Sequence, residues 1–427
     1  MTILLGGVQL AILLIICLYE LEKKSVSVFL WAVLILMFGI MHFFTTINGD
    51  YEYSEKVINK ASIFVIVFCV SYLFCRKVIN KFLTEQTIKI NTKYEYKKAD
   101  NRFLNFLVIM LIIIVIIQLL NLTISAGGIK NTSWGNMRKA TANSEYLSYS
   151  QVFTTIFFTT SSCIILSLIR GDKRKFIIVV LVNIVEVVIS RNRIEILPIF
   201  CSIIIYYILK MKKITLKQIT FFVILAIFAI YSVYALRVYR HYGTLQTFVK
   251  EFNFVEFNEK VNLYLKTDNG ELGLRRHFYY FINSNNDFND FGKGHTYIRM
   301  LMVGIPTQWS FGIKPSDFAI SMGSAIDPTI VGYSIHPTLF GDVYANFGDF
   351  GVLMGFFWAL YTSIIDRILQ KQKQSIKITS ILICSVAYVI IGRGSVYNGF
   401  VWQFYGLIII QVLSIISRFR FIRKNER

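Results

Sequence analysis

Long apolar stretches, separated by mostly short polar segments, run along almost the whole chain. A stretch of about 20 mostly apolar residues is long enough to cross the hydrocarbon core of a bilayer as a helix. None of the 45 Lys and Arg residues lies inside these stretches. The pattern predicts an all-α, polytopic integral membrane protein with about 11 transmembrane helices in a single membrane domain, 1–427. The predicted spans are 3–19, 27–47, 61–75, 103–124, 151–169, 176–189, 194–209, 218–236, 339–365, 378–391 and 400–417.

A long polar segment, 237–338, interrupts this pattern between the eighth and ninth predicted spans. It holds four of the five prolines of the chain. Near its start, 244–265 has apolar residues at helical spacing. This predicts an amphipathic helix that either packs against the bundle or lies at the membrane interface. Further on, 297–311 is apolar but contains Pro306, which predicts a re-entrant or interfacial hairpin.

The composition agrees with a membrane protein and excludes most other classes. Hydrophobic residues make up 55% of the chain and charged residues 16%, and the mean hydropathy is +0.56. All six cysteines lie in apolar stretches or at their ends, so we expect neither disulfides nor a metal site, and no motif indicates a cofactor. The net charge of the chain is +20. In a membrane protein, Lys and Arg in the cytoplasmic loops account for such a charge, so we expect no nucleic-acid partner.

The basic residues divide the connecting segments into two sets. Of the 45, 27 lie in 20–26, 76–102, 170–175, 210–217, 366–377 and 418–427. Short basic loops face the cytoplasm, so we expect an outside N-terminus and a cytoplasmic C-terminus. The segment 237–338 is then a large extracytoplasmic loop. Nucleotide-activated donors are absent on that side, so chemistry there needs a substrate that carries its own activation.

Two short turns of the predicted outer face carry arginine. In the first, Arg191 and Arg193 lie between two spans and are followed by Glu195; in the second, Arg393 lies between glycines. Guanidinium groups match phosphate oxygens bidentately, although arginines at helix ends also anchor to lipid headgroups. We interpret both turns as candidate anion sites.

The polar segment adds further candidates. Arg275, Arg276, Arg299 and Lys314 are its candidate anion-binding residues. His336 ends the segment at the expected outer mouth of the next span, six residues before Asp342. With an ordinary pKa near 6.5, a histidine there can act as a general base.

Four segments of the chain resemble the Wzy-type O-antigen and capsular repeat-unit polymerases. They are 190–195, 269–276, 294–315 and the most specific one, Gly341 to Gly348 followed by Gly351. Members of that family often have Glu where this chain has Asp342, and Arg where it has Thr307. The resemblance covers roughly residues 100 to 415.

The resemblance implies an enzyme of the bacterial cytoplasmic (inner) membrane that polymerises oligosaccharide repeat units carried on undecaprenyl diphosphate. Its active site would face the extracytoplasmic side, and its partners would be the lipid-linked substrates and a chain-length regulator. We expect catalysis by His336, Glu195 or Asp342, with no metal. We expect diphosphate binding by the basic candidates Arg191, Arg193, Arg275, Arg276, Arg299, Lys314 and Arg393.

Three other functions remain open from the sequence. An O-antigen ligase would transfer finished glycan from the same lipid to another acceptor. A metal-dependent transferase using lipid-phosphate sugars would need an acidic motif, for which only Asp50-Tyr51-Glu52 qualifies. A lipid-oligosaccharide flippase would line a deep cavity with basic residues, whereas here none lies in a predicted span. Lipopolysaccharide, capsule and exopolysaccharide are equally compatible products.

Overall fold

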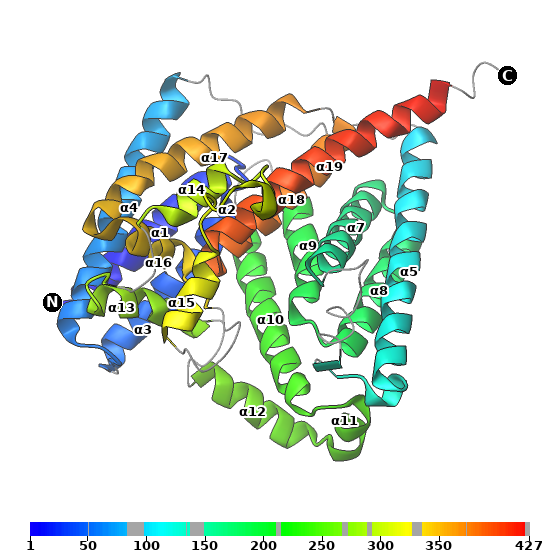
Figure 1. The fold of residues 1–427 in the computed structure, drawn as a ribbon, viewed down its shortest axis with the longest axis horizontal. Helices are drawn as coiled ribbons and strands as arrows, with labels where there is room; N and C mark the ends of the chain where they lie inside the picture. The colour runs from blue at the N-terminus through cyan, green and yellow to red at the C-terminus, as the bar shows by residue number, and fades with distance from the viewer. Residues whose placement is uncertain are drawn as a thin grey trace. The chain divides into compact units, whose positions relative to one another are not determined.

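The chain forms two compact groups of helices in a computed structural model (Figure 1). Unit 1 comprises 1–89 and 270–427, and unit 2 comprises 90–269. The long polar segment is therefore shared between the units, which are described separately below. All regular structure in the described residues is helical. Those residues are 1–49, 51–82, 98–133, 135–136, 149–210, 215–266, 272–287, 293–326, 335–372 and 374–422.

In the described residues, six helical stretches are long and apolar enough to cross a membrane, which supports a multi-pass membrane protein; the last of them comprises the two helices α16 and α17 described below. Each of the six coincides with a span predicted from the sequence. They are Thr2–Glu22, Val28–Asn48, Glu55–Ile79, Leu104–Ala126, Leu216–His241 and Thr338–Lys371. Shorter apolar helices occur at Thr159–Arg170, Leu197–Ile208 and Val396–Val412.

Three antiparallel helical stretches form the frame of unit 1. These are α1 (Thr2–Glu22), the continuous run α2 (Val28–Leu34), η1 (Ile35–Ile40, a π-helix) and α3 (Met41–Asn48), and α4 (Glu55–Phe82). His42 lies beside Ser62, whereas Trp31 packs on Tyr72 with ring centroids 4.6 Å apart. We call the end at which α4 begins the Glu55 end and the opposite end the Phe82 end.

The second part of the polar segment is built into this frame. It contains η4 (Leu272–Leu274), α13 (Arg275–Asn283), α14 (His295–Leu301), η5 (Thr307–Trp309) and α15 (Phe318–Ile326). Phe278 of α13 is fully buried, and its ring lies 5.8 Å from Phe38 and 5.5 Å from Phe64. An apolar side chain every third or fourth residue thus inserts α13 between η1 and α4.

The predicted span 339–365 is two helices that run in opposite directions along α4. Along α16 (Thr338–Phe347), Phe340 contacts Phe68 and Tyr344 contacts Phe64, so this helix runs toward the Glu55 end. Gly348 then adopts φ +57° and ψ −141°, a conformation that is essentially open only to glycine, and ends the helix.

After the turn η6 (Gly348–Leu353), α17 (Met354–Lys371) runs back toward the Phe82 end. A Cβ on Gly355 would lie 2.4 Å from the Phe68 carbonyl oxygen, so the absence of a side chain permits this close approach. Further along, Thr362 lies 3.2 Å from the Tyr72 hydroxyl. The apolar pattern predicted the helical character of the range but not its reversal.

The last two helices, α18 (Gln374–Arg393) and α19 (Val396–Ile422), form a closely packed hairpin. A Cβ on Gly399 would lie 2.5 Å from Ile391, and one on Gly406 would lie 2.6 Å from Ile383. The intervening turn, which was predicted to be an outer loop, is largely buried in unit 1. A Cβ on Gly392 would lie 3.1 Å from Leu30, in the first turn of α2 and roughly 25 Å from Asn48 along the helical run.

Unit 2 consists of helices that begin with α5 (Lys98–Ala126). It continues with η2 (Ile129–Asn131), α7 (Tyr149–Arg170), α8 (Lys173–Ser190), η3 (Arg193–Ile196), α9 (Leu197–Lys210), α10 (Leu216–His241), α11 (Leu245–Glu251) and α12 (Phe254–Lys266). Figure 1 shows α11 and α12 at the end of α10. Phe248 of α11 packs on Tyr239, with ring centroids 4.6 Å apart. Phe248 therefore packs against α10, whereas Val249, Phe252 and Val255 of the same predicted apolar face are exposed.

Candidate functional site

The turn that joins α8 to α9 in unit 2 holds the best candidate for an anion-binding side chain. Arg191 ends α8 in the left-handed conformation, with φ +58°, and its N–H donates to Val187 O at 2.9 Å. This backbone turn directs a fully buried guanidinium toward the end of α10. The group lies over the Tyr239 ring at 4.3 Å, and its Nη1 donates to Gly243 O at 2.8 Å.

The remaining N–H groups of Arg191 are open. Nε and Nη2 are buried and have no hydrogen-bond partner in the described part of the chain. No carboxylate among the described residues forms an ion pair with this guanidinium. Burial lowers the pKa of Arg191 from its usual value, but an arginine stays protonated at neutral pH. A buried cation of this kind is stabilised when an anion binds to it.

Glu195 shares this turn but does not neutralise the arginine. Its carboxylate accepts a hydrogen bond from Asn192 Nδ2 at 2.6 Å and one from Ser190 Oγ at 3.5 Å. Its backbone carbonyl accepts from Asn183 Nδ2 at 3.1 Å. These contacts hold η3 against the end of α8. Arg193 begins η3, but its side chain lies outside the described part of the structure.

A second arginine reaches the same turn from α10. Arg240 Nη2 donates to Arg191 O at 3.1 Å, and Arg237 lies over the Tyr264 ring at 4.6 Å. The ends of α8 and α10 in unit 2 are therefore basic.

In unit 1 the structure gathers a different set of predicted residues at the start of α16. His277 Nδ1 lies 3.1 Å from His336 O, and His336 Nδ1 lies 3.6 Å from the position of a Cβ on Gly394. Thr338 N–H donates to Gly394 O at 2.9 Å. His336 is thus placed beside the Arg393–Gly394 turn and is partly buried.

The backbone at this point is strained. Thr338 is a buried, β-branched residue with φ +65°, a conformation that such residues rarely adopt. Strain of this kind persists only where neighbouring contacts impose it, and here the bond to Gly394 O does so. Burial lowers the pKa of His277 from its usual value, although its bond to His336 O opposes this shift.

The other basic residues of α13 face the Glu55 end. Arg275 is buried, and its Nη2 donates to Thr45 Oγ1 at 2.9 Å. Arg276 Nε forms an ion pair with Glu52 at 3.0 Å, in which both side chains are well exposed. Both arginines therefore have contacts within unit 1, and these contacts attach α13 to the α3–α4 connection.

The remaining predicted residues are parts of local contacts. Asp342 is fully buried, lies 3.4 Å from Thr296 Oγ1 and accepts from Asn346 Nδ2 at 3.1 Å, which joins α14 to α16. Arg299 donates to Pro315 O and lies over the Tyr397 ring, and Lys314 donates to Ile305 O at 2.7 Å. We therefore leave these three side chains out of the proposed site.

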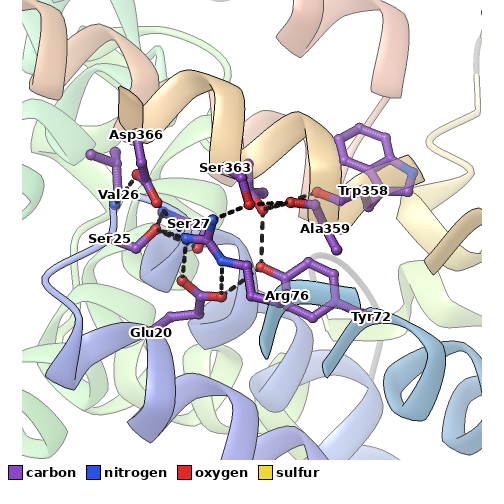
Figure 2. A network of polar contacts seen from close by, with 11 residues as sticks. Glu20, Ser25, Val26, Ser27, Tyr72, Arg76, Trp358, Ala359, Ser363 and Asp366 are labelled. Carbon is purple, nitrogen blue, oxygen red and sulfur yellow. Dashed lines mark hydrogen bonds and ion pairs between the residues drawn. The ribbon is translucent and has the colours of Figure 1, made fainter. Parts of the chain in front are cut away.

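Sequence reasoning missed a buried ionic network at the Phe82 end of unit 1 (Figure 2). Arg76 donates to both oxygens of Glu20, from Nε and Nη2 at 2.9 Å each, and also forms an ion pair with Asp366. Ser25 and Ser363 accept further hydrogen bonds from its guanidinium. The network joins α1, α4 and α17. The only hint of it in the sequence is that each of its three charged residues directly follows a predicted span.

His42 was also missed. Its two ring nitrogens lie 2.6 Å from Tyr279 Oη and 2.7 Å from Ser62 Oγ, so it connects α13 to both α3 and α4. No group of three or more His, Cys, Asp or Glu side chains in the described residues has the geometry of a metal site.

Comparison with known proteins adds nothing to this geometry. No family model matches the chain, and no curated protein or solved structure is similar to it.

Proposed function

We propose that the protein is a membrane glycosyltransferase that polymerises undecaprenyl-diphosphate-linked oligosaccharide repeat units at the extracytoplasmic face of the bacterial cytoplasmic membrane. The observation that carries the proposal is the Arg191 guanidinium, which is buried and has two open nitrogens in the turn after α8. Nε and one Nη of a guanidinium together match two oxygens of a phosphate. The multi-pass helices and the resemblance to repeat-unit polymerases supply the rest of the argument.

The reaction needs no activated nucleotide. A hydroxyl oxygen of the acceptor sugar forms a bond to the anomeric carbon of the donor, and the bond from that carbon to the diphosphate oxygen breaks. The glycan moves to the acceptor, undecaprenyl diphosphate leaves, and the hydroxyl proton passes to a base. We assign the leaving diphosphate to Arg191, where fixed positive charge stabilises the developing anion.

Two side chains are separate hypotheses for the base. Glu195 lies in the same turn as Arg191 and is held by Asn192, and His336 is the candidate at the start of α16 that the sequence suggested. The replacements Glu195→Gln and His336→Asn distinguish them, because only the variant that lacks the base loses chain extension while still binding the lipid-linked substrate.

The test of the proposal is the length of the glycan made in cells that carry Arg191→Lys. Lysine retains the positive charge but cannot donate two parallel hydrogen bonds to a phosphate, so we expect the ladder of chain lengths to be lost. Arg174→Lys is the matched control, because Arg174 is exposed near the other end of the same helix and its replacement should leave the ladder intact. Equal amounts of both variants in the membrane exclude an effect of misfolding. A full ladder from Arg191→Lys would contradict the assignment.

Deletion of the gene separates polymerase from ligase. Loss of a polymerase leaves single repeat units on the final acceptor, whereas loss of a ligase leaves none.

A further inference from the structure

Residues 301–313, which follow α14, form a hairpin whose large apolar side chains point away from the rest of unit 1. Phe311 is 92% exposed, Leu301 88% and Trp309 71%. Ile305 and Ile313 are exposed as well. A soluble surface rarely exposes so many large apolar groups in one short segment, so this surface is one that another apolar phase covers.

The contacts of α14 show at which depth of unit 1 the hairpin begins. Thr296 at the start of α14 bonds Asp342, which lies in α16 between the residues that contact Phe64 and Phe68. These positions on α4 are about 14–20 Å from the Glu55 end at 1.5 Å per residue. Since the hydrocarbon core is about 30 Å thick and α4 is longer than this, α14 begins well within the depth of the core.

From there the chain runs further toward the Phe82 end. Tyr297 Oη lies 3.4 Å from Trp358 Nε1, and Trp358 is in the part of α17 that packs beside Tyr72. The base of the hairpin is then fixed to α19, where the Tyr405 hydroxyl donates to Val303 O at 2.9 Å. Tyr405 is followed on α19 by exposed apolar side chains, among them Ile408, Ile409 and Val412. The hairpin thus lies next to a helix surface that is itself apolar.

The polar backbone of the hairpin is largely satisfied from within. Val303, Ile305, Trp309, Ser310 and Ile313 donate their N–H groups to carbonyls three residues earlier. The ammonium of Lys314 donates to Ile305 O, and the Ser310 hydroxyl to Thr307 O. Internal hydrogen bonding of this kind is what a non-helical segment requires where water is absent.

We infer that the 301–313 hairpin is a re-entrant element whose exposed apolar side chains contact the acyl chains of the bilayer. Leu301, Trp309, Phe311 and Ile313 form the lipid-facing surface. Arg299 and Lys314, at its two ends, are engaged by Pro315 O and Ile305 O and close the hairpin.

The test is the accessibility of a nitroxide attached to Phe311→Cys, with Leu301→Cys as a second site, in protein whose native cysteines are replaced and which is reconstituted in phosphatidylcholine–phosphatidylglycerol vesicles. Both positions are so exposed that a label does not disturb packing. The nitroxide should collide more often with oxygen, which concentrates in hydrocarbon, than with a water-soluble nickel complex. Lys56→Cys, exposed in the first turn of α4, is the control and should show the reverse.

Two results would overturn the inference. A label at Phe311 that collides mainly with the nickel complex lies in water. A label that neither reagent reaches is covered by protein, either unit 2 or a second copy of the chain. The labelled proteins must keep the melting temperature of the cysteine-free parent, and Leu301→Cys decides the question where Phe311→Cys does not fold.

Discussion

Replacing Arg76 tests whether the buried network at the Phe82 end holds unit 1 together. Arg76→Met removes both ion pairs and leaves the fully buried Glu20 with the Tyr72 hydroxyl, 2.8 Å away, as its remaining described partner. Breaking a buried pair from one side costs about 3–5 kcal/mol, because the other charge stays buried without compensation. We expect the free energy of unfolding to fall by that amount, with α1, α4 and α17 separating at this end.

The measurement is unfolding in mixed micelles by titration with sodium dodecyl sulfate, followed by circular dichroism. Lys60→Met is the matched control on the same helix, since Lys60 pairs with Asp349 at 2.9 Å but the two side chains are 39% and 69% exposed. An exposed pair contributes about 0–1 kcal/mol. The double variant Glu20→Gln/Arg76→Met should be more stable than Arg76→Met because it lacks one unpaired charge. Equal losses for Arg76→Met and Lys60→Met would refute this account.

Two further predictions concern unit 1. Gly355→Ala should destabilise the protein by about 1–3 kcal/mol, because the new Cβ meets the backbone of Phe68 and Tyr72, whereas Gly304→Ala, which has open space, should be neutral in the same titration. Because burial lowers the pKa of His277, the unfolded chain binds a proton below about pH 6.5 before the folded protein does, so stability should fall as the pH decreases from 7 to 5. His277→Asn, whose amide can still donate to His336 O, should make the stability depend less on pH in melting curves recorded across this range. If the pH dependence is unchanged, other groups cause it.

The membrane class and most long helices follow directly from the sequence. An apolar run such as 103–124 or 218–236 has few alternatives to a helix, and its length alone predicts the span. The reversal at Gly348 does not follow, because the range 339–365 is apolar as a whole and the break depends on one backbone conformation. The buried position of the Arg393 turn depends on close packing of α18 with α19 and α2, which hydropathy does not record.

The polar contacts were the least predictable part. Arg76 stands directly after a span, where basic residues commonly mark a cytoplasmic loop, and its partners are 56 and 290 residues away in the sequence. His42 and Tyr279 are likewise far apart in the sequence, by 237 residues, so their contact could not be predicted from it. Arg191 was a candidate in the sequence because a guanidinium matches phosphate oxygens, but its burial and open nitrogens come only from the structure.

The most direct test of the proposed function is extension of a lipid-linked repeat unit by the purified protein. Vesicles that contain the protein receive undecaprenyl-diphosphate-linked repeat units of the host, and the products are separated by size while released undecaprenyl diphosphate is measured. We predict glycans of increasing length that stay on the lipid, with one undecaprenyl diphosphate released for each new linkage. Arg174→Lys should behave like the wild type, and Arg191→Lys should release none. Release without lengthening, or no reaction although the substrate is accessible at the outer face, would contradict the account.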